Sequence, residues 1–167
     1  GEVPDPSKVY KAEGREALDL PFNTVYLPSY YDLRDEYRLT PVKDQGDDGN
    51  CWAFACYGSL ESHLTYEKEW DFSENHMKNT HGFDIPVNKG GNRSMATAYL
   101  ARGGGPVLEE NDPYQEGSVW SNPDSPLEKI VTEVLYIPDR EENSPFDNDR
   151  IKWAIMEHGG VHTSMYF

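Results

Sequence analysis

Residues 41–54 of the chain read PVKDQGDDGNCWAF, a turn-rich loop that runs directly into an apolar segment. Gly46 and Gly49 let the loop turn tightly, because glycine accepts backbone angles that other residues avoid. Asn50 is a good N-cap residue, and the residues after it predict a helix over 51–67. The first two turns of this helix are apolar on nearly every side, which is typical of a buried central helix.

Cys51 opens the predicted helix and has features that suit a nucleophilic thiol. The positive end of the helix dipole favours the thiolate, which is the reactive form of cysteine. Gln45 lies six residues earlier, across the glycine-containing loop. Its side-chain amide could fold back toward the backbone N–H of Cys51, which would give two donors for an oxyanion.

The second cysteine, Cys56, lies five positions after Cys51. Helix geometry separates their Cα atoms by roughly 8 Å, beyond the reach of a disulfide, so we expect two thiols. We interpret Cys56 as a structural residue, because it lies in mid-helix within an apolar run. A buried structural role is the alternative for Cys51. The cysteine spacing fits no usual zinc pattern, so we expect no metal and no cofactor.

The stretch 41–54 resembles the nucleophile segment of the papain/cathepsin family of cysteine peptidases, whose local signature has the form C-G-[SA]-C-[WY]. The similarity continues in order along the chain. It is carried by Asp32-Leu33-Arg34, Phe72-Ser73-Glu74, Gly90-Gly91 with Ala96 and Tyr99-Leu100, Glu109-Glu110 to Pro113-Tyr114, and Ile151 to Val161. The resemblance implies an α+β, papain-like fold over 27–167, mainly the helical left lobe with the first strands of the β-rich right lobe. We interpret 1–26 as an N-terminal extension or a remnant of a pro-segment.

The resemblance also implies an activity and a set of site residues. A family member would be a cysteine endopeptidase that cleaves peptide or protein substrates through an acyl-enzyme on Cys51, with Gln45 as oxyanion-hole donor. Gly90 and Gly91 match the backbone that pairs with an extended peptide. The positions that match the lining of the main specificity pocket are Asn92, Arg93 and Ser164.

The chain departs from the family pattern close to the nucleophile. Asp48 stands where the family has a disulfide cysteine, and Asn50 stands where it has serine or alanine. This branch is therefore expected to lack that disulfide. The sequences of residues 73–79 and 90–102 resemble those of secreted bacterial or archaeal members of the family, which are often parts of larger surface proteins. We expect a secreted or cell-surface location and further domains.

A thiolate peptidase also needs a histidine, and an Asn or Asp to orient it. In the family both lie roughly 130–150 residues after the cysteine, an interval that Phe167 does not reach. We therefore expect an inactive fragment, with both residues beyond its end. None of the five histidines is expected to substitute: His63 lies about 18 Å along the same helix, and the others are expected solvated (His76 and His81), at a helix end (His158) or on a strand (His162).

The rest of the chain predicts a short helix near 73–77, helices over 93–101 and 149–157, and strands over 130–137 and 161–167. The formal net charge is −15, from 15 Lys plus Arg against 30 Asp plus Glu, which disfavours nucleic acid as a partner. No apolar run is long enough for a membrane span. Two other functions stay open: a non-catalytic papain-fold surface or binding module, and a thiol acyltransferase.

Overall fold

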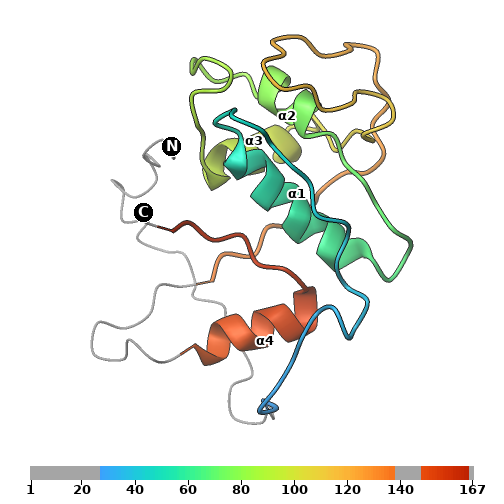
Figure 1. The fold of residues 1–167 in the computed structure, drawn as a ribbon, viewed down its shortest axis with the longest axis vertical. Helices are drawn as coiled ribbons and strands as arrows, with labels where there is room; N and C mark the ends of the chain where they lie inside the picture. Colours follow the sequence, from blue (N-terminus) through green and yellow to red (C-terminus); the bar gives the residue numbers. More distant parts are fainter. Residues whose placement is uncertain (1–26, 138–147, 166–167) are drawn as a thin grey trace.

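The computed structural model of the protein describes residues 27–137 and 148–165, and four helices lie within them (Figure 1). In chain order they are α1 Cys51–Leu64, α2 Glu74–Thr80, α3 Arg93–Ala101 and α4 Asp149–His158. Within these described ranges the backbone forms no named strand. Two single β-bridges pair Gly49 with Lys89 in parallel and Phe72 with Leu108 in antiparallel orientation.

Helix α1 is the centre of the molecule, as its apolar sequence predicts. Figure 1 shows it running between α2 and α3 on one side and α4 on the other. Ala53 and Tyr57 are fully buried, and Trp52 and Leu64 are nearly so. They share one hydrophobic core with side chains of α2, α3 and the intervening loops: Trp70, Phe72, Met77, Met95, Ala96, Tyr99 and Leu100. The first residue of α1, Cys51, is therefore mounted on a rigid element.

The bounds of the helices agree with the sequence to within a few residues. Helix α1 ends at Leu64 and is followed by a turn rather than a further helical turn. Ser73 and Asn92 cap α2 and α3, since their side-chain oxygens accept the backbone N–H groups of residues 76 and 95. Helix α4 ends at Gly159, whose φ of 96° lies in the region that favours glycine.

The two predicted strands are not present as strands. Residues 130–137 and 161–165 are irregular, and 166–167 lie outside the described residues. A strand is stabilised by the hydrogen-bond ladder to a neighbouring strand. No segment of the described part provides one here, and Ile130 stays exposed. The β-branched residues alone therefore did not produce a sheet.

A buried charge cluster fastens the segment before α1 to the core. The ammonium of Lys43 lies 2.9 Å from Glu61 Oε1, 3.0 Å from Glu74 Oε1 and 2.7 Å from Asp71 Oδ1, and it also donates to the carbonyl of Phe72. Both glutamates are buried. Burial raises the pKa of Glu74 to about 7, and its Oε2 is buried without a hydrogen-bond partner.

The far end of α1 is fastened to the residues that follow α4. His63 Nδ1 lies 3.0 Å from the carbonyl oxygen of His158. Ser59 Oγ donates to the carbonyl of Gly160, and Ser62 Oγ accepts the Gly160 N–H at 2.7 Å. The far end of α1 is thus held both by the segment before the helix, through Glu61, and by the residues at the end of α4.

Candidate active site

Cys51 is the first residue of α1 and its side chain is exposed. Cys56, one and a half turns later, is partly buried, and burial raises the pKa of its thiol to about 12. Neither cysteine forms a disulfide, which confirms the prediction of two thiols. Only the exposed thiol is therefore placed for reaction with a large substrate.

Asn50 occupies the N-cap position, but its side chain does not cap the helix. Its amide nitrogen instead donates to Asp48 Oδ2 at 3.2 Å, to Asn88 Oδ1 at 3.0 Å and to the hydroxyl of Tyr114 at 3.3 Å. The predicted N-cap position is confirmed, but the capping bond is absent because the side-chain amide is turned toward these partners, two of which are distant in sequence. The result is a loop before Cys51 that is tied to two other loops.

Gln45 lies in the same loop and is held in place through Asp48. The side-chain Nε2 of Gln45 donates to the backbone carbonyl of Asp48 at 2.7 Å. The backbone carbonyl of Gln45 accepts from the hydroxyl of Tyr114 at 2.8 Å. The amide group carries two hydrogens, so one hydrogen remains for a second acceptor. This geometry leaves room for the oxyanion role, which stays a prediction.

Gly90 and Gly91 lie in a loop that packs directly on the segment around Cys51. The bridge between Gly49 and Lys89 joins the two loops, and a β-carbon at Gly49 would lie 2.8 Å from the carbonyl oxygen of Asn88. A β-carbon at Gly91 would lie 2.5 Å from the indole of Trp52. Packing thus requires glycine at positions 49 and 91. Pairing of Gly90 and Gly91 with a peptide stays a prediction.

The three residues predicted to line a specificity pocket lie in different settings. Asn92 is buried, and its Oδ1 accepts from the N–H of Met95, so its observed task is to cap α3. Arg93 is the first residue of α3 and is half-buried. Ser164 is exposed, in the irregular segment after α4. Their contact with substrate stays a prediction.

Two histidines predicted to be solvated are buried instead. His76 is 9% exposed, and its Nδ1 lies 2.7 Å from the hydroxyl of Tyr99. His81 is 5% exposed and packs edge-on against Trp52, with ring centroids 5.8 Å apart. Burial lowers the pKa of both rings. The expectation failed because the aromatic residues that cover these rings come from other helices.

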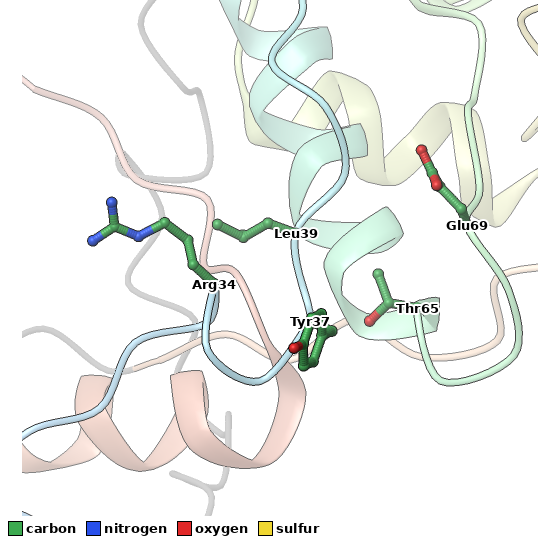
Figure 2. Close-up of a pocket in the computed structure, with 5 residues that line it drawn as sticks. All are labelled: Arg34, Tyr37, Leu39, Thr65 and Glu69. Atoms are coloured by element: carbon green, nitrogen blue, oxygen red, sulfur yellow. The ribbon is translucent and has the colours of Figure 1, made fainter.

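A pocket of about 360 Å³ lies at the far end of α1. Figure 2 shows the side chains that line it, from the loop before α1 and from the end of α1 onward: Arg34, Tyr37, Leu39, Thr65 and Glu69. Because α1 has 14 residues and rises about 1.5 Å per residue, this pocket is roughly 20 Å from Cys51. It is separate from the candidate active site.

Comparison with known proteins agrees with this geometry. The model of a family described as papain family cysteine protease matches residues 27–167. The chain belongs to this family. A cysteine protease of Blomia tropicalis is 32% identical over 161 residues, which is 90% of this chain and 47% of that protein. A viral cathepsin of Heliothis zea nuclear polyhedrosis virus is 40% identical over 93 residues, 54% of this chain and 25% of the relative.

Solved structures of papain-family proteases share the fold. A structure from work on the mite allergens Blo t 1 and Der p 1 superposes with a TM-score of 0.65 at 26% identity, over 84% of this chain and 46% of that one. The cysteine protease and lectin-like domains of Cwp84, a surface layer associated protein of Clostridium difficile, superpose with a TM-score of 0.61 at 26% identity. The match covers 75% of this chain and 29% of that one. The papain-like fold with its helical left lobe is confirmed. The chain spans less than half the length of these relatives.

Within residues 27–137 and 148–165, no three or more His, Cys, Asp or Glu side chains are grouped so that they could hold a metal ion. The helices found there are too short or too polar to cross a membrane.

Proposed function

We propose that the whole protein is a cysteine endopeptidase with Cys51 as its nucleophile. The observation that supports this most directly is the exposed Cys51 thiol at the start of a buried helix, in a chain of the papain family. The Gln45 loop and the Gly90-Gly91 loop are both fastened beside it by the contacts described above. Nucleophile, oxyanion donor and substrate-pairing backbone thus come from neighbouring parts of one half of the fold.

In this mechanism the Cys51 thiolate attacks the carbonyl carbon of the scissile peptide and a C–S bond forms. The carbonyl oxygen becomes an oxyanion, stabilised by the backbone N–H of Cys51 and the second amide hydrogen of Gln45. The C–N bond then breaks, and the leaving amine takes a proton from a histidinium. Water hydrolyses the resulting thioester, which returns the free thiolate and releases the acid.

We place the histidine and the Asn or Asp that orients it after Phe167, as the family spacing implies. The histidines with described contacts support this, because the rings of His63 and His76 bond to groups other than Cys51. The rings of His81 and His158 pack on Trp52 and Trp153. Without these residues the chain is expected to show little turnover. The substrate lies extended along the backbone of Gly90 and Gly91, with one side chain in a polar pocket formed by Asn92, Arg93 and Ser164.

The test is selective labelling of the whole protein with a peptidyl diazomethyl ketone, which reacts with activated peptidase thiols far faster than with ordinary ones. We expect one adduct, at Cys51, and none at the partly buried Cys56. Mass spectrometry of the digested protein locates the adduct, and protein unfolded in denaturant is the control. Labelling of the folded protein no faster than labelling of glutathione would contradict the proposal.

A second test concerns Gln45. We expect Gln45→Ala to lower kcat about 10²- to 10³-fold with little change in KM, because one oxyanion donor is lost. The matched control is Gln115→Ala. Gln115 lies in the loop 114–117, and its backbone carbonyl accepts from Lys78. Alanine keeps this backbone bond, so Gln115→Ala removes only a glutamine side chain. Initial rates with a fluorogenic peptide measure both variants, and equal activity of the two would exclude Gln45 from the oxyanion hole.

We also propose that the protein acts outside the cell or at its surface, in a bacterium or archaeon, as part of a larger protein. The similarity to Cwp84, whose solved part joins the protease to lectin-like domains, supports this. The net charge of −15 suits solubility and an attraction to cationic substrates. Fractionation of the source cells, followed by detection of the protein with an antibody, tests the location; a cytosolic signal alone would overturn it.

A further inference from the structure

Asp48 lies between Gln45 and Cys51 and is bonded to Gln45 and Asn50, on either side of it in the loop. Its carbonyl oxygen accepts from the side chain of Gln45 at 2.7 Å and from the N–H of Asn50 at 2.9 Å. Its carboxylate is turned inward, and the residue is only 8% exposed. A charged side chain in such a place needs partners, because burial of an unpaired charge is costly.

The partners of the carboxylate come from three separate segments. Asp48 Oδ2 accepts from the N–H of Gly117 at 2.8 Å, from the ammonium of Lys78 at 3.0 Å and from Asn50 Nδ2 at 3.2 Å, and it lies 3.2 Å from the Tyr114 hydroxyl oxygen. Burial alone would raise the pKa of Asp48, but the bonds from Gly117 and Lys78 outweigh it and hold the pKa below its usual range. The Asp48 carboxylate thus connects the loop before Cys51 to α2 and to the segment 114–117.

Lys78 is a buried cation on α2. It is 1% exposed, and its ammonium bonds to Asp48 and, at 2.8 Å, to the carbonyl of Gln115. The same ammonium lies 4.5 Å from the centre of the Tyr114 ring, an attractive arrangement. Since Asp48 is the only acid among these contacts, the ammonium depends on it for charge balance.

The segment 114–117 also runs along the loop of Gln45. The Tyr114 hydroxyl donates to the carbonyl of Gln45 at 2.8 Å, and Glu116 Oε1 accepts the N–H of Asp47 at 2.7 Å. Gly46 has a φ of 62°, which favours glycine, and a β-carbon there would lie 2.5 Å from the Glu116 carboxyl carbon, so a larger residue would also require Glu116 to move. The loop is therefore held on both sides of Asp48, which carries the link to α2.

We propose that Asp48 is a positioning residue for the peptidase reaction: by joining the Gln45 loop to Lys78 and to segment 114–117, it fixes Gln45 and the start of α1 relative to each other. The inference rests on the proposed function, in which Gln45 binds the oxyanion. Because an ion pair and hydrogen bonds do this and no cysteine lies in the network, strong reductants that keep Cys51 active leave the loop in place.

The experiment compares Asp48→Ala with Ser62→Ala in the whole protein. Ser62→Ala also removes two hydrogen bonds of a buried side chain, to the carbonyl of Arg38 and the N–H of Gly160, but at the far end of α1. We expect Asp48→Ala to lower kcat per titrated active site about 10- to 100-fold with KM changed less than about threefold. Ser62→Ala should lower Tm while kcat stays within about twofold.

A rescue variant separates positioning from charge burial. In Asp48→Asn with Lys78→Met, an amide oxygen still accepts from Gly117 while the unpaired ammonium is gone. We expect kcat within about fivefold of the wild type. If Asp48→Ala does not fold, Tyr114→Phe, which removes only the hydroxyl bonds to Gln45, Asp48 and Asn50, is expected to lower kcat about 3- to 10-fold. Unchanged kcat in Asp48→Ala, or in Tyr114→Phe where Asp48→Ala does not fold, overturns the proposal.

Backbone hydrogen exchange tests Asp48 independently of activity. We expect the amides of 46–51 to exchange at least about tenfold faster in Asp48→Ala, or in Tyr114→Phe, and to be unaffected by Ser62→Ala. If the wild-type protein cleaves no peptide, the proposed function fails while this measurement still decides whether Asp48 fixes the loop. Equal exchange in all variants refutes the inference even if the protein is an active peptidase.

Discussion

Replacing Cys51 by alanine is expected to lower kcat of the whole protein by at least about 10⁴-fold, because no other group can form the acyl-enzyme. The change should leave stability nearly unaltered, since the Cys51 side chain is exposed and touches little of the core. Peptide hydrolysis and thermal unfolding, measured on the same preparation, check both expectations. Residual cleavage above about 1% of the wild-type rate would refute the role of Cys51.

Cys56→Ala is the matched control for this prediction. It removes the other thiol of the chain, from the same helix, but from a partly buried position. We expect kcat within about twofold of the wild type and a loss of about 1 kcal/mol in the free energy of unfolding, from the lost packing. The opposite pattern, with activity lost on replacing Cys56 and kept on replacing Cys51, would exchange the two roles.

The helices were predictable because their signals are local. Ser73 and Asn92 carry capping oxygens, and the structure uses both. The apolar residues of α1 indicate a central helix in the sequence alone, and the core confirms it. The position of Cys51 at the start of that helix follows from the same local pattern, whereas the exposure of its thiol is seen only in the structure. The sequence therefore locates the candidate nucleophile but not its accessibility.

The network that fixes the site could not be read from the sequence. Lys78 is the clearest case, since lysine is seldom buried and nothing next to it in the chain explains its burial. Its partners Asp48 and Gln115 lie 30 and 37 residues away. The one signal available was the acid at position 48, in place of a family cysteine, which indicates that something other than a disulfide holds the loop.

The failed strands have a related cause. Residues 130–137 contain the β-branched residues that favour strands, but this preference depends on a partner strand. Helices form most of their hydrogen bonds within one segment, so that half of a fold can keep them. The sequence therefore predicts the helical lobe more reliably than the β-rich lobe when a chain covers less than half of its relatives.

Replacing Lys43 by methionine is expected to have the largest effect on stability, a loss of about 3–5 kcal/mol at pH 8, because Glu61 and Glu74 would remain buried without their cation. Burial alone would lower the pKa of Lys43, but Glu74, Asp71 and Glu61 raise it above its usual range. The ammonium is therefore charged throughout the range of a stability experiment, and its removal deletes a full charge.

The pH dependence of this loss has a definite sign. The folded-state pKa of Glu74 is raised to about 7 from 4.5, so its stabilising contribution is complete below pH 4.5 and is lost as the pH rises toward 7. Lys43 lowers the pKa of Glu74, so without Lys43 this pKa rises further. Lys43→Met should therefore lose less stability at pH 5 than at pH 8, as measured by urea unfolding.

Lys68→Met, which removes an exposed lysine stacked on Trp70, is the control and should cost less than about 1 kcal/mol at either pH. An equal loss for Lys43→Met at both pH values would show that packing of the lysine stem, rather than its charge, holds the segment before α1.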